Sequence, residues 1–169
     1  MIIDLNSFDR EKAIDETFAA TAIALELANA KVIEQVMVSG TAIKSSSSVG
    51  IKGRLTTALE IDCDRCLDLV KHAIDIELDL EFAPKQQLEG DASLELHGDD
   101  MKLDAIDGSE LDLAVIVREQ IVLDLPQQFF CSDDCKGLCE KCGTNLNLKD
   151  CECEYNEIDP RWGALKNLN

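Results

Sequence analysis

The sequence predicts an α+β fold, in which a mainly antiparallel β-sheet packs against a helix and a cysteine-rich, zinc-binding segment follows at the C-terminal end. Apolar and polar residues alternate over residues 49–61 and 74–82, which is typical of strands with one buried face. The largely apolar stretch over residues 111–125 is typical of a helix. Six of the eight cysteines lie between residues 131 and 153.

The 169 residues are about one domain's length, and the 46% hydrophobic content is ordinary for a globular protein. We expect an α+β core domain over residues 1–130 and a zinc-knuckle segment with a C-terminal tail over residues 131–169. The sequence has no stretch of about 18 apolar residues and no signal-peptide pattern at its N-terminus, so we expect a cytoplasmic protein without a membrane partner.

The chain is strongly acidic. Lys and Arg number 16 against 34 Asp and Glu, which gives a formal net charge of −18. Nucleic-acid binding usually needs a basic surface, and the 4% of aromatic residues leaves few side chains on which bases could stack. The charge either keeps the protein in solution or attracts and steers a basic protein partner.

Strand patterns begin after the first 31 residues, which fit a strand and a buried helix equally well. Residues 34–43 have a β-rich composition, and the alternating stretch 49–61 follows a polar loop over residues 44–48. Two such segments joined by a short loop predict an antiparallel hairpin.

The clearest alternation covers residues 74–82, where one face is apolar. The other face consists of Asp75, Glu77, Asp79 and Glu81. These four acids form either a solvated outer face or a docking strip for a basic partner. Residues 86–100 are predicted to be an exposed acidic excursion that includes Asp99 and Asp100, and residues 101–106 a short strand.

The predicted helix begins at Leu111 and ends before Pro126, with Ser109 as its N-cap. Acidic residues in the first turn suit the helix dipole. Apolar residues lie nearly all round this helix, so we expect it to be well buried.

The cysteine spacing predicts metal binding, because clustered thiols in a reducing compartment more often bind metal than form disulfides. Cys139-x-x-Cys142 followed by Gly143 is typical of a zinc knuckle, and Cys151 and Cys153 are the nearest candidates for the opposite pair. At least one zinc is expected.

Eight cysteines could also make two sites. The second would join Cys63 and Cys66, which lie in a turn between two predicted strands, to Cys131 and Cys135. An iron–sulfur cluster or a redox switch would use the same ligand type.

No catalytic constellation stands out in the sequence. His72 and His97 fall in no nucleophile or metalloprotease motif, and the sequence contains neither a P-loop nor a dinucleotide-binding glycine pattern. We therefore expect a protein that is not an enzyme and has no small-molecule substrate.

Several ordered motifs, from about Gly40 onward, resemble the YceD family, also called domain of unknown function 177. The motifs are Cys63-Asp64-Arg65-Cys66-Leu67, residues 107–113 followed by Arg118-Glu119 and residues 123–126, residues 135–147, and the ending Asp159-Pro160-Arg161-Trp162 with Leu165. Many members of the family carry Pro where this chain has Glu140, a departure that leaves both knuckle cysteines in place.

The resemblance implies a role in the accumulation or processing of large-subunit ribosomal RNA. It also implies a frequent gene neighbour, a small basic zinc-ribbon protein of the large ribosomal subunit. Because some members lack most of the C-terminal cysteines, the resemblance implies that the cluster stabilises or docks rather than catalyses.

Three functions follow as hypotheses. The first is a non-enzymatic ribosome biogenesis factor that escorts a basic large-subunit ribosomal protein and acts on ribosomal RNA indirectly. The second is a direct RNA-binding zinc module that uses the basic residues near the cysteines, which are Lys136, Lys141, Lys149 and Arg161. The third is a thiol redox sensor or enzyme.

Overall fold

The computed structural model describes residues 1–46, 48–85 and 103–153. The chain divides into two compact units. The sheet unit combines Met1–Asp62 with Leu69–Gln127, and the cysteine unit combines Cys63–Asp68 with the chain from Gln128 onward. Whether residues 1–130 and 131–169 fold as separate domains stays a prediction.

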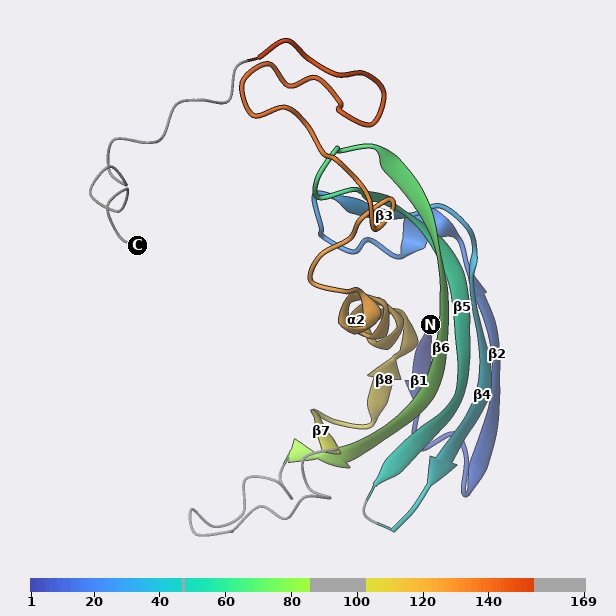
Figure 1. Ribbon diagram of the computed structural model, residues 1–169. Helices are drawn as coiled ribbons and strands as arrows, with labels where there is room; N and C mark the ends of the chain where they lie inside the picture. Colours follow the sequence, from blue (N-terminus) through green and yellow to red (C-terminus); the bar gives the residue numbers. More distant parts are fainter. Residues whose placement is uncertain (47, 86–102, 154–169) are drawn as a thin grey trace, which may run out of the picture. The chain divides into compact units, whose positions relative to one another are not determined.

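The sheet unit is a mixed, mostly antiparallel β-structure with one α-helix among its described residues, which confirms the predicted class (Figure 1). Its elements are β1 (Ile2–Asp4), β2 (Glu11–Phe18), the 3-10 turn η1 (Ala20–Ala22), β3 (Ala30–Val32), β4 (Val36–Lys44), β5 (Val49–Asp62), β6 (Leu69–Pro84), β7 (Leu103–Ile106), β8 (Glu110–Asp112) and α2 (Leu113–Asp124). The main sheet has the order β2-β4-β5-β6-β7, with β3 also paired to β5. β1 and β8 form a separate two-stranded sheet.

The predicted hairpin is confirmed, because β4 and β5 pair antiparallel from Lys44 opposite Val49 onward. The Ser45 N–H donates to the Ser48 carbonyl across 2.8 Å and closes the turn. β5 and β6 contain the two alternating stretches and pair along their whole length. β7 pairs parallel to β6, and it is the only parallel neighbour among the strands described.

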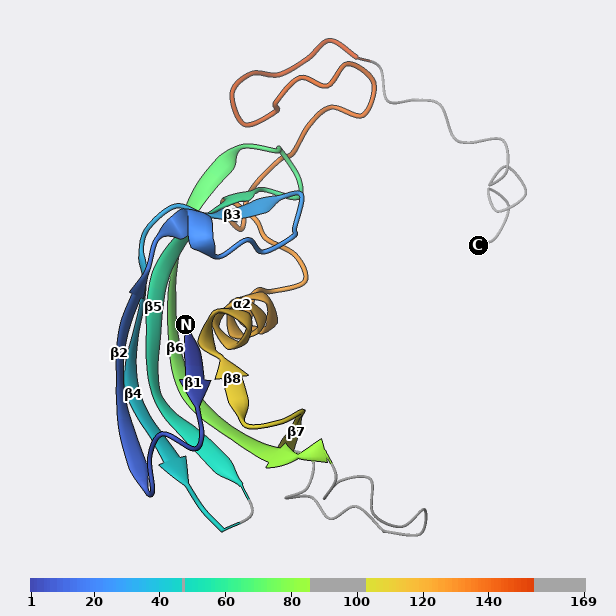
Figure 2. The ribbon, with the colours of Figure 1, turned by 180° about the vertical axis from the view of Figure 1, so that it is seen from behind.

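The sheet is curved, and its concave side carries both α2 and the β1–β8 pair (Figures 1 and 2). Alternation places one set of apolar side chains on this side, and the fully buried ones include Leu55, Leu59, Ile74 and Leu78. The helix contributes Leu113, Ile116, Val117 and Ile121 to the same core. The hydrophobic effect thus holds the helix against the sheet.

The predicted helix start at Leu111 is wrong, and so is Ser109 as its N-cap. Residues 110–112 form β8 instead and pair with β1. Asp112 caps the helix, and its Oδ1 accepts a hydrogen bond of 3.0 Å from the Ala114 N–H. Sequence could not show this, because the pairing partner of Leu111 lies at the far N-terminus.

The expected burial of the helix all round is also wrong. Val115, Val122 and Leu123 are exposed, and Leu123 retains 75% of its accessible surface. The physical reason is that α2 has the sheet on one side only. None of the described helices combines the length and the apolar character needed to cross a membrane. The cytoplasmic location stays a prediction.

The ambiguous N-terminal stretch contains strands β1 and β2 and the start of β3, with the 3-10 turn η1 after β2. Ile23 and Leu25 are buried although they lie outside regular strands, so the alternation of apolar residues at these positions does not indicate a strand. The acidic excursion, Asp99, Asp100, His97, Met101 and the whole tail after Cys153 with Arg161 lie outside the described residues.

Two glycines face each other at the middle of the sheet. Gly40 of β4 is paired with Gly53 of β5. A Cβ built on Gly53 would lie 2.8 Å from the Gly40 Cα and closer still to the Ser39 carbonyl oxygen. The two strands therefore approach each other more closely than any side chain at these positions permits.

We expect Gly53→Ala to destabilise the sheet unit by about 1–3 kcal/mol, because the new methyl group must push backbone apart. Gly50→Ala in the same strand is the matched control, since its Cβ would have no neighbour closer than 3.7 Å. Urea unfolding followed by circular dichroism measures both free energies of unfolding. Equal stabilities of the two variants would show that the close approach has no energetic consequence.

The position of the N-cap gives a second test. Asp112→Ala should lower stability by about 1 kcal/mol, because it leaves the Ala114 N–H without its acceptor. Ser109→Ala should have little effect, and Asp112→Asn should retain most of the stability. The same unfolding assay applies. A larger loss from Ser109→Ala than from Asp112→Ala would restore the cap that the sequence predicted.

Candidate functional site

The cysteine unit brings all eight cysteines of the chain into two groups of four. The first tetrad is Cys63, Cys66, Cys131 and Cys135, and the second tetrad is Cys139, Cys142, Cys151 and Cys153. Within each tetrad the sulfur atoms lie within 4.8 Å of one another. This is the two-site grouping that the spacing allows, and each tetrad could hold a metal ion.

Sulfur separations in the first tetrad fit a tetrahedral metal. With a Zn–S bond of about 2.3 Å, the edge of a ZnS4 tetrahedron is roughly 3.8 Å. The Cys63 and Cys135 sulfurs are 3.8 Å apart, and the Cys66 and Cys131 sulfurs are 3.6 Å apart. A disulfide needs about 2.05 Å, and all eight cysteines are free.

The two Cys-x-x-Cys turns have the same backbone hydrogen bonds. The residue after the second cysteine donates its N–H to the first cysteine's carbonyl, at 2.9 Å for Leu67 and 2.8 Å for Gly143. Both residues have a positive φ, 61° and 69° respectively. A side chain resists this conformation, and Leu67 adopts it nonetheless. Cys63–Cys66 is therefore a knuckle of the same form as Cys139–Cys142.

Arg65 and Asp64 fasten the segment that carries the other two ligands of the first tetrad. The Arg65 guanidinium donates to the Cys135 carbonyl at 3.1 Å and lies 4.1 Å from the centre of the Phe130 ring. Asp64 Oδ2 accepts from the Phe129 N–H at 2.6 Å. In the sequence, the only signal for these contacts is the family motif Cys63-Asp64-Arg65-Cys66-Leu67.

The first tetrad is the more enclosed of the two. Cys63, Cys66 and Cys135 are buried in a small cluster with Phe130 and Leu138. In the second tetrad only Cys139 is buried. Solvent therefore reaches the sulfurs of the second tetrad more easily.

Hydrogen bonds favour thiolates at two positions of the first tetrad. Burial opposes ionisation of Cys63, but backbone N–H groups of Cys66 and Cys131 outweigh it and lower the pKa of Cys63 to about 6. The side-chain amide of Asn147, which donates to Cys135 Sγ across 3.3 Å, lowers the pKa of Cys135.

The remaining thiols respond to their neighbours. The Asp68 backbone favours the Cys66 thiolate, but burial and the adjacent thiols outweigh it and raise the pKa of Cys66. The contact with Cys135 raises the pKa of Cys131. In the second tetrad, Thr144 lowers the pKa of Cys142, and Cys142 in turn raises the pKa of Cys153 to about 12. In the first tetrad, Cys63 and Cys135 therefore ionise more readily than Cys66 and Cys131.

These pKa directions predict how metal binding depends on pH. At pH about 7 Cys63 is largely ionised before metal arrives, whereas at pH about 5 it is protonated. Each metal in the first tetrad should therefore displace about one more proton at the lower pH, and its apparent affinity should fall. Titration of reduced protein with Zn2+ in weak buffer with a pH indicator counts the protons. The Cys151→Ser, Cys153→Ser chain confines the count to the first tetrad, and equal proton counts at the two pH values would contradict the lowered pKa of Cys63.

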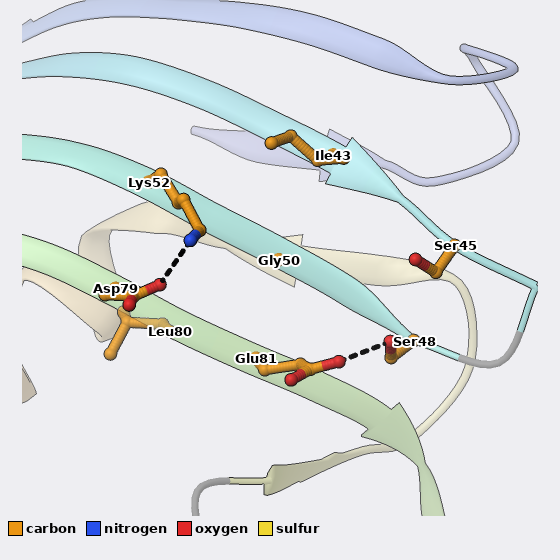
Figure 3. Close-up of a pocket in the computed structure, with 8 residues that line it drawn as sticks. All are labelled: Ile43, Ser45, Ser48, Gly50, Lys52, Asp79, Leu80 and Glu81. Atoms are coloured by element: carbon orange, nitrogen blue, oxygen red, sulfur yellow. Dashed lines mark hydrogen bonds and ion pairs between the residues drawn. The ribbon is translucent and has the colours of Figure 1, made fainter.

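The predicted acidic strip lies on the face of the sheet opposite α2, and all four acids are exposed. The strip is not purely acidic, because Arg54 forms an ion pair of 2.5 Å with Asp75 and Lys52 one of 3.3 Å with Asp79. Figure 3 shows the Lys52–Asp79 pair and the bond of 2.6 Å from the Ser48 hydroxyl to Glu81. These residues line a depression of about 370 Å³ on β4, β5 and β6.

Other residues that the sequence singled out are dispersed. Lys136, Lys141 and Lys149 are exposed in the cysteine unit. His72 lies half-buried in β6 and belongs to neither tetrad. Asn147 donates to Cys135 of the first tetrad, and Asn145 donates to Asp68 beside Cys66.

Comparison with known proteins places these motifs among relatives. A protein of Arabidopsis thaliana named large ribosomal RNA subunit accumulation protein YCED homolog 1, chloroplastic, is 39% identical over 59 residues, which are 35% of this chain and 18% of that protein. The homologue of the same name in Zea mays is 27% identical over 190 aligned positions, which cover 96% of this chain and 64% of that protein. The chain thus spans less than two thirds of both plant proteins.

A bacterial relative is matched over most of its length. The uncharacterized protein YlbN of Bacillus subtilis is 26% identical over 155 residues, which are 91% of this chain and 86% of YlbN. No solved structure matches the chain. Residues 51–169 match the family described as "Large ribosomal RNA subunit accumulation protein YceD", which is well over half of the chain and includes both cysteine tetrads. The resemblance seen in the motifs is confirmed, and the chain belongs to the YceD family.

Proposed function

We propose that this protein is a non-enzymatic ribosome biogenesis factor that supports the accumulation of large-subunit ribosomal RNA by escorting a basic ribosomal protein in the cytoplasm. Membership of the YceD family carries the first part of the proposal, since the family and the plant relatives are named for this role. The charge of the molecule supports the second part.

Each tetrad would hold one Zn2+ in this proposal. Four thiolates within tetrahedral reach suit zinc, which has no redox chemistry and stabilises small folds by cross-linking distant segments. Here the metal would join the Cys63–Cys66 turn to a segment that follows 65 or more residues later. An iron–sulfur cluster uses the same ligands, and elemental analysis of freshly purified reduced protein distinguishes the two.

The same arrangement argues for a structural rather than a catalytic use of the cysteines. A thiol redox enzyme needs an accessible thiolate as its nucleophile. All eight cysteines of the chain belong to a tetrad, so metal at both sites would leave none to react.

Electrostatics favours a basic protein over RNA as the direct partner. The net charge is −18 before metal is counted, and a tetrathiolate zinc site adds further negative charge because four thiolates outweigh one divalent cation. The exposed lysines of the cysteine unit have acidic neighbours in the sequence, such as Glu140 beside Lys141 and Asp150 beside Lys149. A phosphate backbone would meet mostly repulsion on such a surface.

The proposed function is tested by removing the gene from its host and measuring the ratio of large-subunit to small-subunit ribosomal RNA. We expect a lower ratio, restored by the wild-type gene. Affinity capture at several salt concentrations, with both protein and RNA identified, should recover a basic ribosomal protein even after nuclease treatment. Capture of ribosomal RNA alone, lost when Lys136, Lys141 and Lys149 are replaced by Gln, would establish the RNA-binding alternative instead.

The acidic strip gives a sharper test of the partner. Glu77→Gln with Glu81→Gln removes two charges from β6 and leaves the Arg54–Asp75 and Lys52–Asp79 ion pairs in place. We expect association with the captured basic protein to slow by about twofold to tenfold at low salt, with a smaller effect at high salt, because screening shortens the reach of the field. Stopped-flow or surface-based kinetics measures the rate.

The matched control for charge is Glu110→Gln with Glu119→Gln, which removes two exposed acids from β8 and α2. If both pairs of changes slow association equally, only the net charge acts and the strip is not the docking surface. Thermal unfolding of each variant verifies that the fold is unchanged.

A further inference from the structure

We infer that the two tetrads bind metal as a coupled pair, because the loop that joins the two halves of the second tetrad supplies hydrogen bonds to the first. The inference rests on the metal binding proposed above and concerns residues 143–150, between Cys142 and Cys151. All of the contacts that carry it lie within the cysteine unit.

Asn147 makes the most direct link. Its Nδ2 donates to Cys135 Sγ across 3.3 Å, and its Oδ1 accepts from the Lys136 N–H across 2.8 Å. Both ends of the amide are therefore directed at the ligand of the first tetrad and the residue after it. A donor at a thiolate disperses its charge and orients the sulfur toward the metal.

Asn145 links the loop to the other side of the same tetrad. Its Nδ2 donates to Asp68 Oδ2 across 2.9 Å, and that oxygen lies 3.3 Å from Cys66 Sγ. The Cys66 thiol donates to this oxygen, and once metal ionises Cys66 the Asn145 amide would remain as the donor that compensates the Asp68 carboxylate. Asn145 Oδ1 also accepts from the Asn147 N–H at 3.0 Å, so the two asparagines hold each other in place.

The loop backbone is seated by the segment between the two tetrads. The Leu146 N–H donates to the Gly137 carbonyl at 2.9 Å, and the Leu138 N–H donates to the Arg65 carbonyl at 3.0 Å. Gly137 has a φ of 75°, and a Cβ there would come within 3.0 Å of the Arg65 oxygen. Residues 145–147 are thus stacked, through 136–138, on the Cys63–Cys66 knuckle.

A physical consequence follows. Metal in the second tetrad ties both ends of the 143–150 loop and orders it, and the ordered loop presents Asn147 to Cys135. Loss of the second metal frees the far end of the loop and weakens the hydrogen bond at the first tetrad. Linkage is reciprocal, so metal in the first tetrad raises the affinity of the second by the same factor.

Titration of the full reduced chain with Co2+, whose absorption reports tetrathiolate binding, tests the coupling. Cys151→Ser with Cys153→Ser isolates the first tetrad, and Cys63→Ser with Cys66→Ser isolates the second. We expect each isolated tetrad to bind about 10- to 100-fold more weakly than in the wild type, the range seen when outer hydrogen bonds to ligands are lost. A wild-type curve equal to the sum of the two isolated curves would overturn the inference.

Asn147→Ala tests the route of the coupling with all eight cysteines in place. It should weaken Co2+ binding at the first tetrad about 10-fold in the wild type, and it should have little further effect once Cys151 and Cys153 are Ser. Leu148→Ala, at a side chain that is 81% exposed in the same loop, should change neither. An equal effect of Asn147→Ala in both backgrounds would show that Asn147 acts locally and would overturn the inference.

Two further measurements distinguish the loss of the Asn147 donor from a general disturbance of the loop or the fold. Asn147→Asp keeps the acceptor for the Lys136 N–H while removing the donor, so it should weaken binding at least as much as alanine even if alanine perturbs the loop. Circular dichroism checks that the sheet remains folded in every variant. A wild-type chain that binds neither Co2+ nor Zn2+ would refute the metal sites themselves, and with them this inference.

Discussion

The cysteine unit depends on one contact, in which the Cys63–Cys66 turn packs against the segment that carries Cys131 and Cys135. Among the residues described in this unit, the buried cluster consists of three cysteines of the first tetrad, with Phe130 and Leu138 packed against it. A segment of this size cannot recover its conformational entropy from hydrophobic burial alone. In the proposed metal-bound form, four thiolates around a cation would supply the missing free energy, and the donors at Cys63 and Cys135 favour their thiolates.

The remaining contacts of that unit reinforce the same meeting of segments. Arg65 and Asp64 hold the chain before and between Cys131 and Cys135, and Asn145 and Asn147 bring the second loop onto the first knuckle. Such short, polar contacts are worth little individually in water. Together they hold the segments that carry the first tetrad, and the Asn147 bond reaches the Cys135 sulfur itself.

The sheet unit is stabilised by different physics. Its long strands bury one apolar face beneath α2. Within the curved sheet, the paired glycines Gly40 and Gly53 allow the backbones of β4 and β5 to approach closely. The outer face carries charged side chains, some of them in ion pairs such as Lys52 with Asp79. Stability therefore comes from the inner face, which leaves the outer face available for recognition by charge.

Sequence by itself determined the features that depend on local pattern. Alternation located β5 and the centre of β6, the serine loop located the hairpin, and the cysteine spacing contained both knuckles and the family motifs. Period and spacing are local properties, so they can be recognised without knowing where the rest of the chain lies.

The tertiary structure decided what depends on distant partners. Leu111 lies in a strand because Ile3 pairs with it. Leu123 is exposed because none of the described residues covers that side of the helix. Asn147 reaches Cys135 because the second loop folds back over the first knuckle. Each of these outcomes is set by the free energy of a contact between residues far apart in the chain, which no local pattern records.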